Sequence, residues 1–467
     1  MAKSEVKVAL VNPPLLPGMF KHHPLVPLGL AYLASVLENA GYEVKVFDCP
    51  PLGLSHEELT KLLVKFSPDF VGITCMTMMY PSAIKVAEMI KEQLPEVVIG
   101  VGGPHVTFYD KETLEECPSI DLVVRGEGEQ TILEVVASLK EGGKLSNISG
   151  ITLRKNGEIV KTPDRPHIQN LDALPYPAYH LFPMDKYRIY GRKIMPIITS
   201  RGCPFQCSFC VTSRMVGRKF RARSPQNVVD ELEWLVKEHG ADAVCFYDDT
   251  LTLDRKRMIE ICRMIKERKI DVVWDCQTRV DQISLEILGE MVKAGCRLVS
   301  FGVESGSDKV LGRIGKGTTV EQNKRAIMLA KKVGLLVAVS VIIGYPGETP
   351  ETVNETLRFL WETRPDDAYI CFATPYPGTE LRRMIEELGW EISNDWSKYD
   401  TLNPVFKNPE IPGEYMIRLR EDFYNKFYSP SYIIRHFLKK DLYGRAMART
   451  ALNHFIWRMR GWRARKI

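Results

Sequence analysis

Thr199-Ser-Arg-Gly-Cys-Pro-Phe-Gln-Cys-Ser-Phe-Cys210 is the stretch of sequence that decides the fold. It spaces Cys203, Cys207 and Cys210 as C-x3-C-x2-C, directly after the apolar run 194–198. Three thiolates this close can each bind one iron of a [4Fe–4S] cube and leave the fourth iron without a protein ligand. The alternatives are a zinc site or three incidental thiols, but zinc sites usually show paired C-x2-C units and four ligands. Because no fourth Cys follows at matching spacing, we interpret the motif as a cube with one open iron.

The cysteine spacing resembles that of the radical S-adenosylmethionine (SAM) enzymes. The resemblance implies that the open iron chelates SAM, which is then cleaved reductively. An electron donor of the ferredoxin or flavodoxin type is the partner that such a reaction needs.

Strand and helix patterns alternate through the region that begins with this motif. Each predicted strand after the first is preceded by a helical stretch, and six such units predict a partial (β/α)6 barrel, the fold of the resembling family. Its active face would lie at the carboxyl ends of the strands. The predicted strands are 194–198, 243–247, 272–276, 298–304, 336–343 and 368–374.

Polar groups and glycines follow these predicted strands. Asp248-Asp249 ends the second strand, Gly302–Ser307 matches a strand-4 element of the family, and 344–348 resembles its later glycine motif. By resemblance we expect the SAM-binding residues to be Phe209, Asp248, Asp249, Gln277, Arg279, Glu304, Ser305, Gly344 and Tyr376.

The first 145 residues also read as alternating strands and helices. Strands separated by helices of ten or more residues predict a doubly wound, flavodoxin-like parallel sheet, so the fold class is α/β. Ligands bind such sheets beyond the carboxyl ends of the strands. The predicted strands are 6–11, 43–47, 70–74, 97–102 and 121–125.

The loops at that edge resemble the cobalamin-binding domain that precedes many radical SAM domains. Glycines there allow close backbone approach, and methionines supply soft apolar surface. The residues expected to bind cobalamin are Asn12, Pro13, Thr77, Met78, Met79, Tyr80, Gly102, Gly103, His105, Thr107, Arg125, Gly126 and Glu127.

One familiar cobalamin motif is missing from the sequence. Asp-x-His-x-x-Gly, whose His ligates cobalt from below, does not occur, and His22, His23, His56 and His105 all lack that context. We therefore expect no strong His ligand on cobalt. Our hypothesis is that Met78, Met79 or Tyr80 packs against the lower face, with ordinary core packing of this loop as the alternative.

The chain divides into four predicted segments. Residues 1–145 form the cobalamin-binding domain, 146–190 a hairpin with a Pro-rich linker, 191–405 the barrel, and 406–467 a basic helical region. From Arg435 to Lys466 there are ten Lys and Arg against Asp441 alone, interleaved with Trp457 and Trp462. Three interpretations compete: a dock for an acidic protein or peptide, a nucleic-acid contact, and a helical cap over the barrel mouth. We favour a cap that also docks the substrate.

Composition limits the class of protein. The net charge of +5 on 467 residues does not indicate a nucleic-acid binder. Eleven Cys without an N-terminal signal sequence predict a reducing, cytoplasmic location rather than disulfides. The apolar runs are too short to span a bilayer.

By resemblance the function is that of a class B radical SAM methyltransferase. Such an enzyme abstracts hydrogen from an unactivated sp3 carbon with a 5′-deoxyadenosyl radical and transfers a methyl group from methylcobalamin. The basic C-terminal region favours a protein or peptide substrate, a glutamine of methyl-coenzyme M reductase being one candidate. The alternatives are a cyclase or C–C coupling enzyme acting on a lipid or tetrapyrrole, and a non-catalytic cobalamin or Fe–S sensor.

Overall fold

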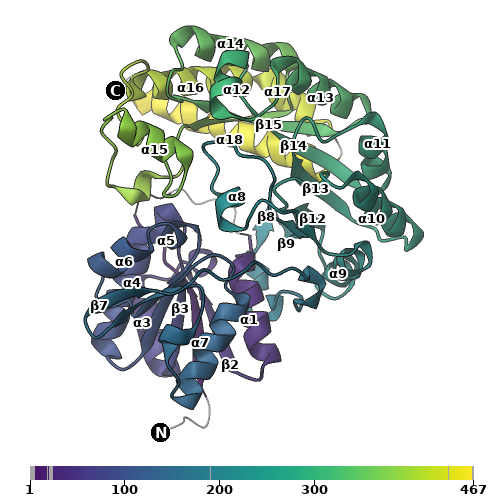
Figure 1. The fold of residues 1–467 in the computed structure, drawn as a ribbon. Helices are drawn as coiled ribbons and strands as arrows, with labels where there is room; N and C mark the ends of the chain where they lie inside the picture. Colours follow the sequence, from purple (N-terminus) through teal and green to yellow (C-terminus); the bar gives the residue numbers. More distant parts are fainter. Residues whose placement is uncertain (1–5, 18, 20–24, 190, 440, 465–467) are drawn as a thin grey trace.

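The computed structural model describes residues 6–17, 19, 25–189, 191–439 and 441–464, with side chains as far as Ile456 in the last helix. Two sheets, each flanked by helices, are followed by a C-terminal group of helices (Figure 1). His22, His23 and the side chains of Trp457 and Trp462, all named above, lie outside the described part.

The first sheet has seven strands in the order β2-β1-β3-β4-β5-β6-β7. Its first five strands are parallel and follow the 2-1-3-4-5 order of flavodoxin-like folds. The predicted doubly wound sheet is therefore confirmed. These strands are β1 (Lys7–Asn12), β2 (Glu43–Asp48), β3 (Phe70–Thr74), β4 (Val98–Gly102) and β5 (Leu122–Val124).

Both faces of this sheet are buried, because alternate residues of a strand point to opposite sides. Val8 and Leu10 of β1 pack with helices α1 (Leu28–Asn39) and α7 (Glu129–Glu141). Ala9 and Val11 pack with helices α3 (His56–Phe66) and α4 (Tyr80–Gln93) on the other face. An apolar run with no polar alternation is the sequence pattern of such a strand.

A hairpin extends the first sheet. Strands β6 (Ile151–Lys155) and β7 (Glu158–Lys161) are antiparallel to each other, and β6 pairs antiparallel with β5. The sheet thus runs to Lys161, past the predicted boundary at residue 145, and its last two strands make it mixed rather than purely parallel.

The second sheet contains the six predicted parallel strands, with the short strand β8 (Arg188–Ile189) antiparallel at one edge. It curls into a half-barrel, which confirms the expected fold (Figure 1). Helices α9 (Pro225–Lys237), α10 (Arg255–Glu267), α11 (Leu285–Lys293), α13 (Val320–Lys332) and α14 (Pro350–Thr363) connect its strands. The parallel strands are β9 (Arg192–Ile197), β12 (Ala243–Phe246), β13 (Val273–Thr278), β14 (Cys296–Glu304), β15 (Leu336–Ile343) and β16 (Asp367–Phe372).

Helix α16 (Gly413–Phe427) begins beside the carboxyl end of β15, where Met416 lies against Gly344, and the two helices after it close the opposite end of the half-barrel from the cysteine loop. In α17 (Pro430–Phe437), the Tyr432 hydroxyl donates to the carbonyl of Asp366, just before β16 begins. At the start of α18 (Leu442–Ala464), Tyr443 packs on Leu336, the first residue of β15. The predicted cap over the barrel mouth is therefore wrong, because both helices pack at the amino ends of the strands.

Within the described residues, no helix combines the length and the apolar character needed to cross a membrane.

Candidate active site at the cysteine loop

A two-stranded ribbon closes the base of the cysteine loop. Strand β10 (Ser200–Arg201) pairs antiparallel with β11 (Arg221–Ala222), and residues 202–220 form the loop between them. Gly202, at φ +93°, lies so close to the returning chain that a Cβ there would be 2.2 Å from the carbonyl oxygen of Lys219. The amide of Cys203 donates to the carbonyl of Gly217 over 3.2 Å. The glycine is required by this close approach, which fixes the start of the cysteine motif.

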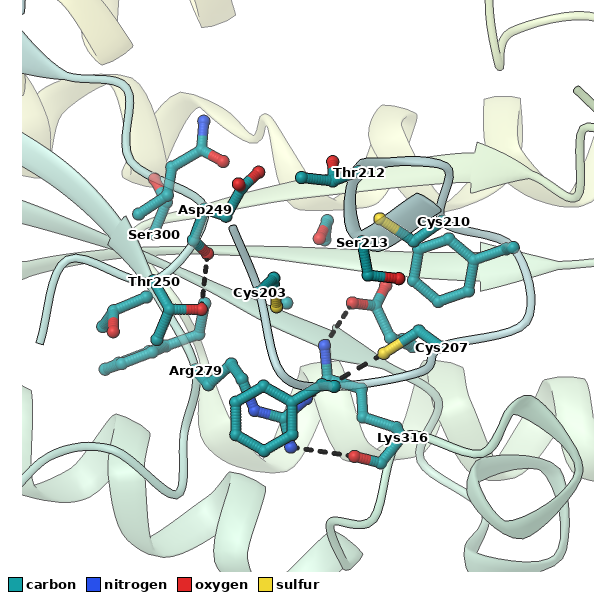
Figure 2. A pocket seen from close by; sticks show the side chains of 18 of the residues that line it. Cys203, Cys207, Cys210, Thr212, Ser213, Asp249, Thr250, Arg279, Ser300 and Lys316 are labelled. Atoms are coloured by element: carbon teal, nitrogen blue, oxygen red, sulfur yellow. Dashed lines mark hydrogen bonds and ion pairs between the residues drawn. The ribbon is translucent and has the colours of Figure 1, made fainter. Parts of the chain in front are cut away.

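Cys203, Cys207 and Cys210 line a cavity of about 320 Å³ at the carboxyl ends of the barrel strands. Figure 2 shows the three side chains on the loop that borders this cavity. All three are free thiols and partly exposed. Among the described residues, no three His, Cys, Asp or Glu side chains are near enough to share one metal ion. A [4Fe–4S] cluster does not require three ligands around one metal ion, because each thiolate binds a separate iron.

Burial raises the pKa of two of the thiols. For Cys207 the nearby charges of Lys316 and Arg279 act in the opposite direction and favour the thiolate. For Cys210 hydrogen bonds from Thr212 have that role. Because a thiolate is the form that binds iron, these partners assist ligation.

Arg279 packs against the cysteine loop. Its guanidinium lies 3.5 Å from the centre of the Phe205 ring, a cation–π contact, and 3.9 Å from the sulfur of Cys207. It also donates to both carboxylate oxygens of Asp281, each over 2.9 Å, and to the carbonyl of Lys316 over 2.8 Å. These contacts hold a fixed positive charge beside the thiols.

Glu304 ends strand β14 in a left-handed conformation, φ +63°. Its carboxylate accepts a hydrogen bond of 2.6 Å from the Nζ of Lys316, and both side chains are buried. A Cβ on Gly302 would lie 2.4 Å from this carboxylate and 2.8 Å from Nζ. The ion pair therefore occupies the room that the absent side chain of Gly302 leaves.

The predicted SAM-binding residues separate into two groups. Phe209, Asp249, Gln277, Arg279 and Glu304 line the cavity with the three cysteines. Four others do not line it, namely Asp248, Ser305, Gly344 and Tyr376.

Hydrogen bonds occupy the polar groups of these four. Ser305 contacts the hydroxyl of Thr356, and the Tyr376 hydroxyl donates to the carbonyl of Tyr399. The amide of Gly344 donates to Glu348. Their contacts stabilise the walls of the barrel around the site.

The two adjacent aspartates have different surroundings. Asp248 is buried and accepts hydrogen bonds from the amide and hydroxyl of Thr199 and from the hydroxyl of Ser200, so it links β12 to the chain that leads into the loop. Asp249 lines the cavity. Burial and the neighbouring charge of Asp248 raise the pKa of Asp249 to about 6.

The residues predicted to bind cobalamin gather at the carboxyl edge of the first sheet. Asn12, at the end of β1, donates to Asp48 over 2.8 Å. Gly103, at φ +123°, approaches the β3 loop so closely that a Cβ would lie 2.6 Å from the carbonyl oxygen of Cys75. The amide of Gly126 donates to the Thr107 hydroxyl over 3.1 Å. The loops after β1, β3, β4 and β5 thus meet along one edge, as predicted.

Tyr80 and His105 pack in an aromatic cluster at this edge. Their rings lie 4.4 Å apart, and the ring of Trp396, from the segment that follows β16, lies 4.8 Å from that of His105. The Tyr80 hydroxyl donates to Glu116 over 2.6 Å. Within the described residues neither ring nitrogen of His105 has a hydrogen-bond partner, and burial lowers its pKa to about 3. Of the three side chains expected beneath cobalt, Tyr80 and Met79 are buried, while Met78 is partly exposed.

Arg125 and Glu127 make protein contacts. The guanidinium of Arg125 is buried and donates to the carbonyls of Ile151 and Thr162, which attaches the hairpin to β5. Glu127 forms ion pairs with Arg201 and Arg221 from the ribbon below the cysteine loop. The guanidinium of Arg125 and the carboxylate of Glu127 are therefore both engaged in protein contacts rather than available to a ligand at the edge.

Several lining residues were not predicted from the sequence. Lys316 stands between two glycines in Ile314-Gly-Lys-Gly317, a pattern that could have suggested a constrained functional turn. The hydroxyl groups gave no signal, because isolated Ser and Thr are common in loops. The further polar lining residues are Thr212, Ser213, Thr250, Thr278, Ser300 and Ser340.

Comparison with known proteins agrees with the two-part architecture. Residues 197–360 match the Radical SAM superfamily, and residues 22–136 match the B12 binding domain. The uncharacterized methyltransferase PH0819 of Pyrococcus horikoshii is 41% identical over 402 residues, covering 86% of this chain and 87% of the relative. The anaerobic magnesium-protoporphyrin IX monomethyl ester cyclase of Rubrivivax gelatinosus is 34% identical, covering 92% and 78%.

A solved structure shares the fold of almost the whole chain. The cobalamin-dependent SAM radical enzyme OxsB, with aqua-cobalamin and SAM bound, has a TM-score of 0.76 at 20% identity. The likeness covers 97% of this chain and 72% of that chain.

Proposed function

The chain belongs to the radical SAM superfamily, in the group whose members carry a B12 binding domain, and from this premise we propose that it is a cobalamin-dependent radical SAM methyltransferase. The observation that carries the proposal is the joining of two sites in one chain. Three free thiols at C-x3-C-x2-C spacing line a cavity, and the loop that bears them is ion-paired to the carboxyl edge of a cobalamin-type sheet.

The residues present fit a [4Fe–4S] cluster and SAM. Cys203, Cys207 and Cys210 supply three thiolates for the cluster. The cavity also offers carboxylates at Asp249 and Glu304 and cations at Arg279 and Lys316, which match the ammonium and carboxylate groups of SAM. We assign Asp249 to the ammonium and Lys316 to the carboxylate. When bound, cluster and SAM supply a 5′-deoxyadenosyl radical, and cobalamin supplies the methyl group.

For cobalamin, the first-sheet edge is the site that the fold favours. Gly103 lets the β4 loop lie against the backbone of Cys75 in the β3 loop, and Met78 of the β3 loop remains partly exposed. We therefore narrow the proposed lower-face neighbour to Met78. A cobalamin-loaded structure with Met78 far from the corrin would contradict this assignment.

The methylated atom is an unactivated sp3 carbon in our proposal. The prediction of a protein or peptide substrate, a glutamine of methyl-coenzyme M reductase included, stays a prediction. It depended on the basic residues from Arg435 onward, and the helices that carry them pack at the amino ends of the strands rather than at the cavity. An electron donor of the ferredoxin or flavodoxin type likewise stays a prediction.

A second candidate is a cyclase or C–C coupling enzyme. Its support is the 34% identity to the magnesium-protoporphyrin IX monomethyl ester cyclase of Rubrivivax gelatinosus over most of both chains. A cyclase would form a ring without adding a methyl carbon to the product.

The deciding experiment is anaerobic reconstitution with iron, sulfide, cobalamin and deuteromethyl-labelled SAM, with a strong reductant and extracts of candidate substrates. A methyltransferase gives 5′-deoxyadenosine, S-adenosylhomocysteine and a labelled methyl group in the product, all detectable by mass spectrometry. A cyclase gives 5′-deoxyadenosine and an unlabelled product. Absence of 5′-deoxyadenosine from a preparation loaded with cluster would favour a non-catalytic sensor.

A further inference from the structure

Two arginines at the base of the cysteine loop share one carboxylate of the first domain. Arg201 and Arg221 are direct cross-strand partners in the β10–β11 ribbon. Arg201 donates to Glu127 over 3.1 Å, and Arg221 donates to both oxygens of Glu127 over 2.9 and 3.0 Å. Both ends of the cysteine loop are therefore attached to the same side chain.

A second carboxylate completes the contact. Arg201 also donates to Glu129 over 2.5 Å. All four charged side chains are between 3% and 11% exposed, so water competes poorly for them. Burial alone lowers the pKa of Arg201, but Glu129 and Glu127 more than offset this effect and raise it above its ordinary value. The two positive charges of the arginines are thus balanced by the two negative charges of the glutamates.

The carboxylates come from the edge where the first-sheet loops meet. Glu127 and Glu129 lie in Arg125-Gly-Glu-Gly-Glu129, which follows β5 and ends with the first residue of α7. Gly126 of this motif is hydrogen-bonded to Thr107 of the β4 loop, and Glu127 also accepts from the amide of Ile168 in the linker. The motif thus connects the cobalamin-type edge to the rest of the chain.

The other end of the contact leads directly into the cysteine motif. Arg201 is separated from Cys203 by Gly202 alone, and Gly202 is packed too tightly to accept a side chain. Arg221 additionally donates to the carbonyl of Val216 over 2.7 Å, inside the same loop. A displacement of the ribbon must therefore move the cysteine loop with it.

We propose that Glu127, together with Arg201 and Arg221, is a positioning device that sets the separation between a cluster on the cysteine loop and a cobalamin at the first-sheet edge. This inference rests on the cofactors of the proposed function but not on methyl transfer. Any reaction in which both cofactors act on one substrate needs them held within a narrow range of distances. A buried carboxylate that joins the loop base to the cobalamin edge controls that distance without touching either cofactor.

The test measures the distance itself. A reduced [4Fe–4S] cluster and cob(II)alamin each carry an unpaired electron, and EPR of the doubly loaded protein reports their magnetic coupling, which depends steeply on separation. We expect a single, sharp coupling in the wild type and a broadened one in Glu127→Ala, since a lost supporting contact loosens a site by about 1 Å. The matched control is Glu134→Ala, which removes an ion pair to Arg165 on helix α7, just after the loop that bears Glu127.

Two further variants keep the test decisive where Glu127→Ala fails to fold. Glu127→Gln preserves the shape of the side chain. Arg221→Lys preserves the charge but loses the planar guanidinium, which contacts Glu127 through one nitrogen and the carbonyl of Val216 through the other. Broadening in these variants, with both cofactors loaded at wild-type stoichiometry, supports the inference. A coupling as sharp as wild type in every soluble variant overturns it. Failure of the wild type to load cobalamin would instead contradict the proposed function.

Discussion

The carboxylate of Glu304 lies 2.6 Å from the ammonium of Lys316. Glu304 ends strand β14, whereas Lys316 lies in the loop before helix α13. Glu304 reaches this position only through a left-handed backbone, and the missing side chain of Gly302 makes the space. Because the pair lines the cavity beside the cysteines, it supplies adjacent positive and negative groups to a zwitterionic ligand.

Lys316→Met should both destabilise the protein and weaken SAM binding. It leaves the Glu304 carboxylate buried without a partner, which costs about 3–5 kcal/mol. Glu304→Gln combined with Lys316→Met should recover much of the melting temperature but not the SAM affinity. Lys324→Ala, which removes an exposed ion pair of 3.7 Å, is the control and should change stability by less than about 1 kcal/mol. A Lys316→Met protein as stable as the wild type would contradict the predicted role of the pair.

Cys207→Ala should abolish formation of 5′-deoxyadenosine and leave cobalamin bound. The cluster loses one of three thiolate ligands, whereas the first-sheet edge is unchanged. Chromatography of the nucleoside and the visible absorption of cobalamin report the two effects separately. Cys117→Ala, in the first domain and outside the cysteine loop, is the matched thiol control. Loss of both cofactors together in Cys207→Ala would mean that the two sites do not load independently.

Gly103→Ala should reduce cobalamin binding sharply. At φ +123° an alanine is strained, and its Cβ would also lie 2.6 Å from a backbone oxygen in the β3 loop. Gly142→Ala is the matched control, because its φ of +72° brings similar strain with no atom within 4 Å. Equal cobalamin stoichiometry in the two variants would show that the close approach of the two loops is not needed.

Much of the fold could be predicted from periodicity alone. Strands such as β3 and β15 coincide with predicted ranges, because buried parallel strands read as continuous apolar runs. The cysteine loop was predictable from spacing. Side-chain partners were not: Asp248 and Asp249 are neighbours in sequence, yet only Asp249 lines the cavity. Which of two adjacent residues faces a site depends on the twist of the strand end, and the sequence does not specify it.

Contacts between residues far apart in the chain could not be predicted from the sequence either. The motif 125–129 suggested a ligand loop, whereas Arg125 donates to the carbonyl of Ile151 in the hairpin and Glu127 pairs with Arg221 in the ribbon below the cysteines. The basic residues from Arg435 onward suggested a substrate-docking surface at the mouth of the barrel. The apolar residues among them, Tyr443 and Met447, decide the packing instead, by covering the amino ends of β13 to β15.

Glu348→Gln should stabilise the protein increasingly as pH rises. Glu348 is fully buried and accepts from the amide of Gly344 over 2.6 Å, and burial raises its pKa to about 8. The folded state therefore holds a proton that the unfolded chain releases near pH 4.5, so stability falls as pH increases between these values. A shift of this size corresponds to several kcal/mol. The variant keeps a neutral amide, and its melting temperature should match wild type at pH 5 and exceed it at pH 8.5.

The control for this experiment is Glu351→Gln, an exposed glutamate on the following helix. Its difference from wild type should not grow between pH 5 and 8.5. A Glu348→Gln protein whose advantage is the same at both pH values would contradict the prediction that Glu348 is protonated in the folded state.

Tyr443→Phe separates a structural role of the C-terminal helices from a role in substrate docking. The Tyr443 hydroxyl donates to Asp275 over 2.8 Å, and Cys245 donates to the other oxygen of the same carboxylate over 2.9 Å. Losing the hydroxyl leaves a buried acceptor unsatisfied, which costs about 1–3 kcal/mol. We expect a lower melting temperature but unchanged 5′-deoxyadenosine formation at a temperature where the variant is folded, because the contact lies below the cavity and away from the cysteines. Arg445→Ala, two residues later on the exposed side of the same helix, should change neither quantity if the region is structural. If Arg445→Ala instead raises the KM for the methylated substrate while the melting temperature is unchanged, the basic helices act in docking after all, and the substrate must reach the site from the closed end of the barrel.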